Sequence, residues 1–336
     1  MTKHFCSGWL TLMLAVAAAM PAAAQTFAAP ADGSALTVVH NTWTSGAAVP
    51  TAVAFPAVAV LKGQIYVVGG GTTFGGGPVS DTQIYNPSTN TWSAGVPFPT
   101  TVVYAVAAVA NGILYVIGGS TDGSTWSNAV WAYNPSTKKW SSKSAMPTAR
   151  ASSAATVANN IIYVVGGCDG SNCTNRLDTV ESYNPATNSW TEEAPLLFGK
   201  SNFSIGVIKT TIPPATTIVA AGGYTSAGDT GDNEGYNPSS NTWTTLAFDP
   251  THRDCTCGGS IGSHVYVAGG YDGGVGADMT LMESFTLSTN KWKTLAPLPN
   301  ATVGPGSAVY QGRFYCLGGA TSFQGNAVGY VQIYQP

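Results

Sequence analysis

A few isolated cations and one carboxylate are the residues best suited to hold an anionic ligand. The candidate cations are Arg150, Lys200 and Arg253, since a guanidinium can hold a carboxylate or an acidic sugar through two parallel hydrogen bonds. Asp254 follows Arg253 directly, and a carboxylate beside a cation would supply an acid/base group for sugar-ring chemistry. The alternative is that each cation pairs with a neighbouring acid or a backbone carbonyl and serves the fold.

Three tyrosines are candidates for stacking on a sugar or a peptide. Tyr224 and Tyr271 each follow a Gly-Gly pair directly, and Tyr104 stands near the start of a predicted strand. An aromatic ring with a polar hydroxyl suits a ligand that is partly apolar. These tyrosines complete the set of candidate ligand-binding residues.

Metal and cofactor chemistry finds little support in the residue pattern. His252 and His264 lie at opposite ends of one predicted strand, roughly 35 Å apart if it is fully extended, so they cannot share a metal ion. The chain has no Cys-x-x-Cys pair, which zinc sites commonly use. We therefore expect neither a metal nor a cofactor.

The composition favours an all-β protein and disfavours several other classes. Of the 336 residues, 44% are hydrophobic and only 9% are charged, and there are 40 Gly and 20 Pro. Such a chain has ample apolar surface to fold, and it is poor in the residues that form helices. The net charge is −3, and the 13 Lys and Arg residues are spread along the chain. This disfavours a nucleic-acid partner, which would require a basic face.

The first 24 residues have the pattern of a secretory signal peptide. Lys3 and His4 precede an apolar run of about twelve residues, which is too short to span a membrane. The segment ends in Ala22-Ala23-Ala24, so we expect cleavage after Ala24. This predicts a secreted or periplasmic protein without a membrane span, in which residues 25–37 form a leader.

The cysteines are interpreted in the light of this predicted export. Cys168 and Cys173 enclose a short loop and are expected to form a disulfide, which an oxidising compartment allows. The alternative is two unpaired thiols in a flexible loop. Cys255 and Cys257 would face the same side of a strand, and Cys316 is a further candidate partner. Three thiols cannot all pair with one another, so their pairing stays open.

The chain from residue 38 onward is built on a repeat. An apolar run that ends in a Gly-Gly pair recurs about every fifty residues, which is typical of a repeat architecture. An aromatic pair seven residues apart follows each of the first five doublets. The six doublets begin at Gly69, Gly118, Gly166, Gly222, Gly269 and Gly318, and the aromatic pairs begin at Tyr85, Tyr133, Tyr183, Tyr236 and Phe285.

One repeat contains four strand signals in order. In the second repeat these are 105–110, 113–117, 129–133 and a strand that opens at Trp140. Asn111-Gly112 is a hairpin turn between the first two strands, and Asn134-Pro135 begins a turn between the last two. A four-stranded antiparallel unit of this length is typical of a propeller blade. Because such a unit cannot bury its own faces, each aromatic pair should pack against a neighbouring blade.

The two ends of the repeat region complete each other. Tyr334-Gln335-Pro336 begins the aromatic turn without its Trp, and His40-Asn41-Thr42-Trp43 supplies the missing half. We therefore expect the N-terminal segment to provide the outer strand of the last blade and to close a six-bladed ring. The alternative is that Trp43 belongs to an unrelated leader.

The doublets and the aromatic spacing resemble those of the kelch family of β-propellers, over residues 38–336. In that family an arginine often stands at the start of the first strand, 13 residues before a tyrosine of the second strand. Arg150 and Arg253 fit this rule before Tyr163 and Tyr266, whereas Lys200 fits by context only. The resemblance implies that these residues gather near one mouth of the central channel.

The resemblance implies several functions, because kelch propellers bind proteins, bind glycans or catalyse reactions on one scaffold. We expect a monomeric, exported, non-catalytic module that binds a glycan or a protein at the channel mouth. The alternative is a sugar epimerase or mutarotase similar to the N-acetylneuraminate epimerases. A catalytic site would place Arg150 or Arg253 beside a carboxylate at an open mouth. A protein scaffold would leave the channel blocked and expose apolar side chains on its loops.

Overall fold

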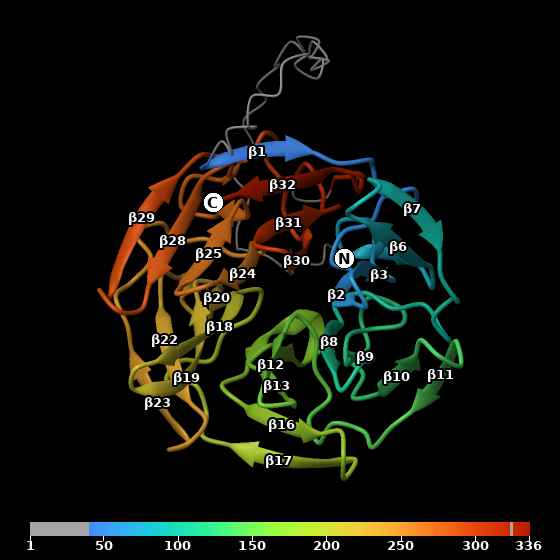
Figure 1. Cartoon of the computed structure of the whole chain (residues 1–336), viewed down its shortest axis with the longest axis horizontal. Coiled ribbons are helices and arrows are strands. Elements are labelled where there is room, and N and C mark those ends of the chain that lie inside the picture. The colour runs from blue at the N-terminus through green and yellow to red at the C-terminus, as the bar shows by residue number, and fades with distance from the viewer. Residues whose placement is uncertain (1–39, 323–324) are drawn as a thin grey trace, which may run out of the picture.

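The chain folds into a ring of six β-sheet blades (Figure 1). The computed structural model describes residues 40–322 and 325–336, so the predicted signal peptide (1–24) and leader (25–37) lie outside the described residues. In the described part only one short 3-10 helix, η1 (Ser171–Cys173), interrupts the β structure. No helix found there is long and apolar enough to cross a membrane. The predicted six-bladed, all-β propeller is confirmed.

Each blade is a four-stranded antiparallel sheet; in five blades the strands run in chain order from the channel to the rim, and in the sixth the outer strand is the N-terminal β1. The six blades consist of β2 (Ala57–Leu61), β3 (Gln64–Val68), β6 (Thr82–Asn86) and β7 (Thr91–Ala94); β8 (Val106–Ala110), β9 (Ile113–Ile117), β10 (Val130–Asn134) and β11 (Lys139–Ser142); β12 (Ala154–Ala158), β13 (Ile161–Val165), β16 (Val180–Asn184) and β17 (Ser189–Glu193); β18 (Ser204–Thr211), β19 (Pro214–Ala221), β22 (Asn233–Asn237) and β23 (Thr242–Thr245); β24 (Cys257–Ile261), β25 (His264–Ala268), β28 (Met282–Thr286) and β29 (Lys291–Leu295); and β30 (Gly306–Tyr310), β31 (Arg313–Leu317), β32 (Val331–Gln335) and β1 (Thr42–Ser45).

The aromatic pairs join neighbouring blades, as predicted. Tyr183 lies directly opposite Trp190 in the sheet, and their ring centroids are 5.1 Å apart. The indole Nε1 of Trp190 donates to the carbonyl of Ser144, in the connection that leads from blade 2 to blade 3, at 2.9 Å. The Tyr183 hydroxyl donates to Asn188 at 2.7 Å, and the same amide oxygen accepts the N–H of Ser144 at 2.9 Å. Each outer turn is therefore tied to the connection that enters its own blade.

The same contact closes the ring across the chain ends. β1 pairs antiparallel with β32, with Trp43 opposite Tyr334. The Trp43 indole donates to the carbonyl of Ala296 at 2.8 Å, and the Tyr334 hydroxyl donates to Asn41 at 2.8 Å. The predicted closure is confirmed, and Trp43 does not belong to an unrelated leader.

The glycine doublets hold adjacent blades at close range. In all six doublets both glycines have positive φ, a backbone region that glycine enters without steric cost. The second glycine donates its N–H to the connection of the next blade, as Gly70 does to Val102 at 2.8 Å. A Cβ on Gly69 would lie 2.3 Å from the Val102 carbonyl oxygen, which leaves no room for any other residue.

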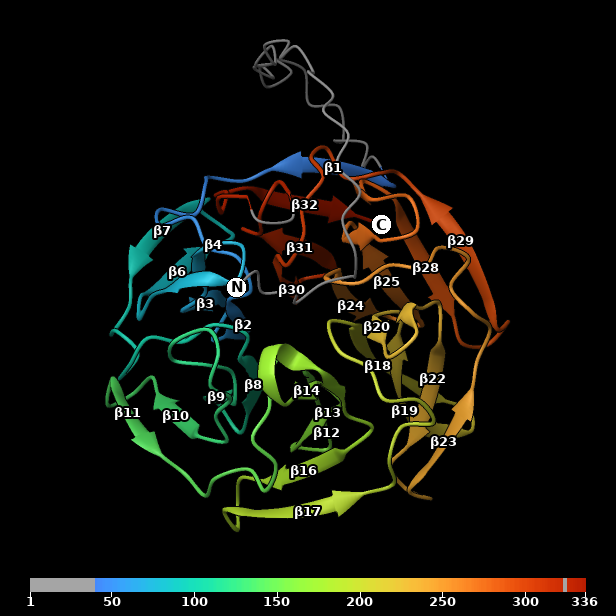
Figure 2. The ribbon, with the colours of Figure 1, turned by 180° about the vertical axis from the view of Figure 1, so that it is seen from behind.

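The ring has two faces with different loops. The face that we call the doublet-loop face bears the loops after the doublets and the connections between blades. Four of these loops form small hairpins, three of which are labelled in Figure 2: β4 (Gly71–Thr73) with β5 (Gly76–Pro78), β14 (Cys168–Asp169) with β15 (Asn175–Arg176), β20 (Tyr224–Thr225) with β21 (Gly228–Asp229), and β26 (Tyr271–Asp272) with β27 (Ala277–Asp278). The opposite face, the turn face, bears the short turns within the blades.

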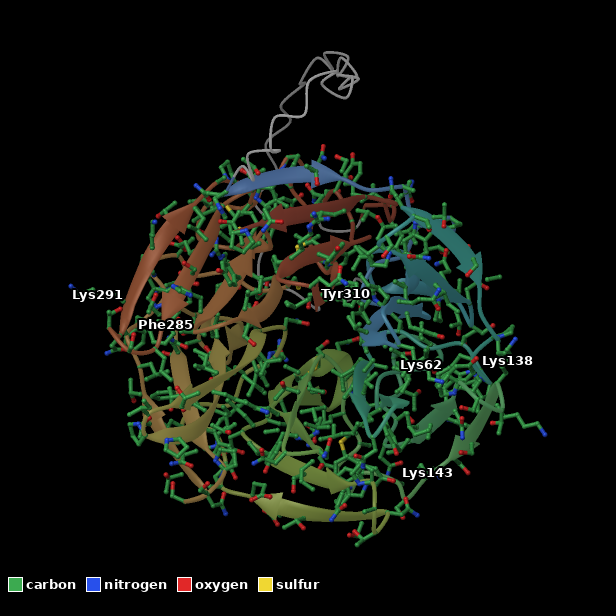
Figure 3. The ribbon with its side chains drawn as sticks, viewed as in Figure 1. Lys62, Lys138, Lys143, Phe285, Lys291 and Tyr310 are labelled. Atoms are coloured by element: carbon green, nitrogen blue, oxygen red, sulfur yellow. A yellow bond between two sulfur atoms is a disulfide. The ribbon has the colours of Figure 1, made fainter. Side chains whose placement is uncertain are left out.

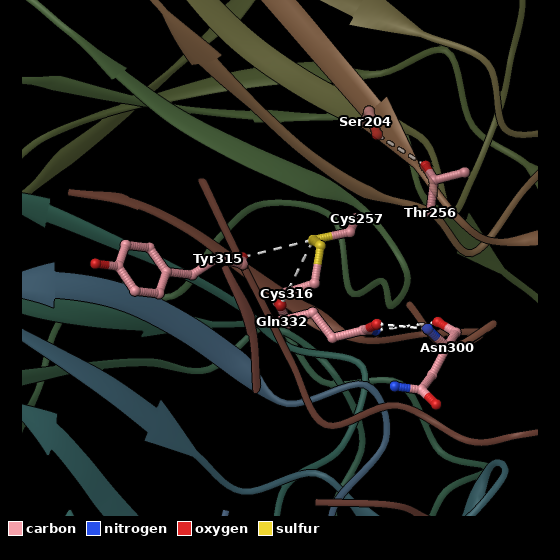
Figure 4. The surroundings of a disulfide bond; sticks show 8 residues. Ser204, Thr256, Cys257, Asn300, Tyr315, Cys316 and Gln332 are labelled. Atoms are coloured by element: carbon pink, nitrogen blue, oxygen red, sulfur yellow. Dashed lines mark hydrogen bonds between the residues drawn. A yellow bond between two sulfur atoms is a disulfide. The ribbon is translucent and has the colours of Figure 1, made fainter. Parts of the chain in front are cut away.

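Two disulfides are present among the described residues. Cys168–Cys173 closes the doublet loop of blade 3, with a Cα–Cα distance of 5.1 Å, as predicted. Cys257–Cys316 joins β24 of blade 5 to β31 of blade 6, with a Cα–Cα distance of 5.9 Å (Figure 4). This second bond resolves the pairing that the sequence left open for Cys257 and Cys316, and it links two blades covalently.

Candidate functional site

Arg150 is a fully buried cation at the start of blade 3. Its Nη2 donates to Glu181 Oε2 at 2.7 Å. The same guanidinium donates to the backbone carbonyls of Val164, Gly166 and Thr179 at 3.3, 3.2 and 2.8 Å. Burial lowers the pKa of Arg150 to about 10, and the nearby Glu181 opposes that shift.

Lys200 and Arg253 occupy the equivalent places in blades 4 and 5. The Lys200 Nζ lies 3.1 Å from Glu234 Oε1, and an Arg253 Nη2 lies 3.0 Å from Glu283 Oε2. Both cations are 0% exposed and also donate to backbone carbonyls. A second carboxylate, Asp249, lies 3.7 Å from the same Arg253 nitrogen, and burial raises its pKa to about 8 despite the attraction of Arg253.

Each cation is buried within its own blade, where it contacts a glutamate and backbone carbonyl oxygens. This arrangement matches the alternative that the sequence left open for Arg150, Lys200 and Arg253. A buried cation needs such partners, because removing a charge from water costs several kcal/mol. Lys200 does occupy the expected place, since the carbonyl of Lys200 accepts the N–H of Gly167 at 2.9 Å, as that of Arg150 does from Gly119.

A closed ring of backbone hydrogen bonds surrounds the channel at its doublet-loop end. One residue per blade donates its N–H to the carbonyl of its counterpart in the preceding blade, at 2.7–3.2 Å. All of these residues have positive φ. They are Phe55, Tyr104, Ser152, Asn202, Cys255 and Gly304. This ring fixes the six inner strands relative to one another and narrows the channel.

Aromatic side chains fill part of this ring. The Phe55 ring lies 4.7 Å from the Tyr104 ring, and a Cβ on Gly304 would lie only 2.5 Å from Phe55. Tyr104 is 3% exposed, and burial raises the pKa of its hydroxyl. The structure therefore places Tyr104 inside the ring, where it packs against Phe55.

The channel beside the ring holds a cavity of about 160 Å³. Its walls are small apolar and hydroxyl side chains of the inner strands, such as Val58, Ala107 and Ser153. None of the described residues that line it carries a charge. The cavity is therefore small and neutral, and it offers no acid or base to a substrate.

The other predicted site residues meet on the doublet-loop face of blades 3–5. Arg176 from β15 stacks over the ring of Tyr224 at 4.8 Å. Burial lowers the pKa of Arg176, and Tyr224 and Asp254 oppose that shift. Asp254 and Tyr271 exchange two backbone hydrogen bonds at 3.0 Å, and the Asp254 side chain is buried. The structure thus brings together Tyr224, Asp254 and Tyr271, with Arg176 as an addition that the sequence did not indicate.

A pocket of about 820 Å³ opens between the doublet loops of blades 4 and 5. Its walls are three segments, 224–229, 250–252 and 272–275. Asp229 Oδ2 accepts the N–H of Gly273 at 2.5 Å, which ties the two loops together. Burial raises the pKa of Asp229 to about 6, and the adjacent Asp272 adds to that shift.

Exposed apolar side chains lie on the pocket wall and on the connections that enter blades 4 and 5. Leu197 and Phe198, in the connection into blade 4, are 46% and 52% exposed. Phe248, in the connection into blade 5, is 55% exposed, and Val275 on the pocket wall is 69% exposed. Large apolar side chains gathered on one face are typical of an interaction surface.

Sequence reasoning missed the three glutamates that neutralise the buried cations. Each stands two residues before the aromatic of its third strand, at Glu181, Glu234 and Glu283. Blades 1 and 6, which lack the cation, have Gln83 and Gln332 at that place. The sequence therefore contained a signal for these pairs: a cation at the start of a blade occurs together with a glutamate two residues before the aromatic of its third strand.

Comparisons with known proteins agree with this architecture. The family model described as the KLHDC2/KLHL20/DRC7 Kelch-repeats domain matches residues 57–248, and the Kelch motif model matches residues 252–299. Kelch-like protein 36 of Rattus norvegicus is 30% identical over 154 residues, which cover 45% of this chain and 24% of that protein. Kelch-like protein terF of Aspergillus terreus is 28% identical over 166 residues, or 45% of this chain and 34% of that protein. The chain thus matches only a quarter to a third of the length of these relatives.

Among solved structures, the one titled "Structure of YjhT" superimposes with a TM-score of 0.70. It is 18% identical in sequence, and the match covers 84% of this chain and 95% of that chain. At this identity the likeness concerns the fold alone. With its family model matched over more than half of its length and all six blades formed, the chain belongs to the kelch-repeat family.

Proposed function

We propose that this kelch propeller is an exported, non-catalytic binding module that takes a protein segment on the doublet-loop face of blades 4 and 5. The observation that carries the proposal is the pocket of about 820 Å³ between these blades, with the exposed Val275 on its wall. The connections into the same two blades expose Leu197, Phe198 and Phe248. Export rests on the predicted signal peptide at residues 1–24.

Two features favour a protein ligand over a sugar substrate. The hydrogen-bonded ring narrows the channel at this face, and the exposed apolar side chains lie on the loops around it. The arginines that a sugar-ring enzyme would use are buried against Glu181 and Glu283, so they do not face a substrate at the mouth. Interfaces gain most of their affinity from a few large apolar or aromatic anchors, which this face offers.

The pocket also suggests how a segment would be oriented. Tyr224 on one wall is held by the stacked Arg176, and the opposite wall carries Asp272, whose Oδ1 accepts the N–H groups of Gly274 and Val275 at 2.8 and 3.2 Å. A bound segment would place apolar side chains on Phe198 and Phe248 and a polar group between the two walls.

The test is selection of peptides from a displayed random library on the immobilised protein. We expect selected peptides to lose at least about tenfold in affinity when Phe198 and Phe248 are both replaced by serine. Ile212→Ser, at an even more exposed apolar residue on the turn face, is the control and should leave the affinity unchanged. Peptides that bind the Phe198→Ser/Phe248→Ser variant as tightly as the native protein would contradict the proposal.

A glycan ligand is the second candidate, because the half-buried Tyr224 and Tyr271 flank the same loops. Proton NMR with free sugars, including N-acetylneuraminic acid, separates the possibilities. Saturation transfer that is lost in Tyr224→Ala would favour a glycan. Faster anomeric exchange than in the absence of the protein would favour the epimerase or mutarotase.

A further inference from the structure

The fold separates charges that are scattered along the sequence. Seven basic residues lie within three positions of the blade turns that make up the turn face. Five of them are in blades 1, 2 and 5, one is in blade 4 and one is in blade 6. They are Lys62, Lys138, Lys139, Lys209, Lys291, Lys293 and Arg313.

No acidic residue that the structure describes lies within three positions of those turns. The described acids stand on the doublet-loop side of the blades, as Asp122, Asp178 and Asp272 do. All seven basic side chains are exposed, and Figure 3 labels Lys62, Lys138 and Lys291 in three different blades. In a chain with a net charge of −3, the turns within the blades therefore carry seven exposed basic residues and no acidic residue among those described.

One blade also extends an apolar tip from this face. In the other five blades the two inner strands have five residues each, whereas β18 and β19 have eight. Three further residues per strand extend the hairpin by roughly 10 Å beyond its neighbours. Ile212 at the tip is 92% exposed, and Lys209 lies near its base.

The tip exposes few polar backbone groups. Pro213 and Pro214 have no N–H, and the carbonyl of Pro213 accepts the Thr210 hydroxyl at 2.7 Å. Transfer of an unpaired backbone group from water to an apolar medium costs free energy. Because the tip has few such groups, it can enter an apolar medium at low cost. An isoleucine almost wholly exposed at the end of an extended hairpin has no packing role within the propeller.

We infer that the turn face docks on an anionic lipid bilayer, with Ile212 inserted at headgroup level and the basic side chains against the lipid phosphates. A depth of about 5–10 Å is typical of proteins that rest in the membrane interface, and the extended hairpin matches that depth. A flat anionic surface matches charges spread over several blades. A nucleic acid or an acidic protein would offer no apolar phase to Ile212.

The proposal predicts graded effects on vesicle binding. Each cation near an anionic surface contributes about fivefold to the partition coefficient. Replacing Lys62, Lys209 and Arg313 together by glutamate should therefore lower binding at least about a hundredfold. Ile212→Ser should lower it about fivefold to tenfold, because the apolar insertion is lost.

The test is cosedimentation of the purified protein with vesicles of phosphatidylcholine, with and without about one third phosphatidylglycerol. We expect binding only to the anionic vesicles, and loss of that binding in about 0.5 M sodium chloride. The matched controls are Lys143→Glu, at an exposed lysine outside the turns, and Val275→Ser, at an exposed apolar residue on the other face. Thermal unfolding of every variant should match that of the native protein, since all these side chains are exposed.

Several outcomes would overturn the inference. These are no binding to anionic vesicles at low salt, equal binding to neutral vesicles, or equal losses in the controls and the turn-face variants. Two results together would assign the face to a soluble polyanion instead. The binding would depend on the cations but not on Ile212, and soluble polyglutamate would displace the protein when its concentration of charges equals that of the anionic lipids. Because the peptide site lies on the opposite face, its failure and the failure of this inference are separate results.

Discussion

The two halves of the ring hold their inner strands in chemically different ways. Blades 3, 4 and 5 place Arg150, Lys200 and Arg253 against buried glutamates. Blades 1, 2 and 6 have Val53, Val102 and Thr302 at the same position.

The partners of the uncharged positions are uncharged as well. Gln83 accepts the N–H of Thr51 at 2.7 Å, and Gln332 accepts that of Asn300 at 2.8 Å. Blade 4 makes the corresponding bond with a charged acceptor, since Glu234 accepts the N–H of Leu197 at 2.7 Å. The backbone bond is therefore common to both halves, and the cation is an addition that requires a glutamate. This comparison shows that the propeller geometry does not need the ion pairs.

The largest expected effect comes from removing one member of an ion pair. Arg150→Val leaves Glu181 buried and unpaired, which should cost about 3–5 kcal/mol of unfolding free energy. Arg150→Val/Glu181→Gln reproduces the residues of blade 1 and should recover most of that loss. Urea denaturation of both variants checks this expectation. A double variant as unstable as the single one would mean that the two halves are not interchangeable.

A smaller effect is expected from the extra carboxylate of blade 5. Asp249 stands where blade 3 has Met146 and blade 4 has Leu196, and burial raises its pKa to about 8. A carboxyl whose folded pKa is raised keeps its proton longer in the folded state, so its contribution to stability is present at low pH. That contribution is lost as the pH rises from the unfolded pKa of 3.8 toward about 8.

Asp249→Leu should therefore stabilise the protein more at about pH 9 than at about pH 5, by on the order of 4 kcal/mol. Denaturation curves at the two pH values measure this difference, and Asp178→Leu, at an exposed acid, is the control. A stability gain that does not change with pH would show that Asp249 does not hold a proton in the folded state.

The smallest effect concerns the aromatic pairs. Tyr183→Phe removes the hydrogen bond to Asn188 and should cost about 0.5–1.5 kcal/mol. Blade 5 has Phe285 at this place, so the fold accepts the change. Thermal unfolding of Tyr183→Phe and of Phe285→Tyr measures the effect on stability of removing the hydroxyl in blade 3 and of adding one in blade 5. A loss as large as that of Arg150→Val would show that the hydroxyl carries more than one hydrogen bond.

Much of the fold was predictable because the same pattern of strands, turns and glycine doublets recurs in all six blades. In blade 2 the strand predicted over 113–117 matches β9, and that over 105–110 differs from β8 by one residue. The inner hairpin of blade 4 is longer than the others, because its strands continue to Thr211 and from Pro214. Proline is allowed there, since it stands at the first residue of a strand, beside the turn.

The candidate site was less predictable, because the types of the residues do not reveal their burial. Arg150 and Arg253 have the chemistry of ligand-binding residues, yet both are buried against glutamates and backbone carbonyls. Arg176, Asp229 and the exposed Phe198 and Phe248 carry no motif, and only the meeting of three loops gives them a common surface.

The sequence by itself determined the number of blades, the closure by Trp43 and the Cys168–Cys173 bond, since all depend on spacing along the chain. The tertiary structure decided which cations are buried, that Cys257 pairs with Cys316, and how charge divides between the two faces. Lys62 and Arg313 lie near opposite ends of the described chain but at equivalent turns of adjacent blades. Such neighbours are set by the closure of the ring, which places in contact residues that no local pattern relates.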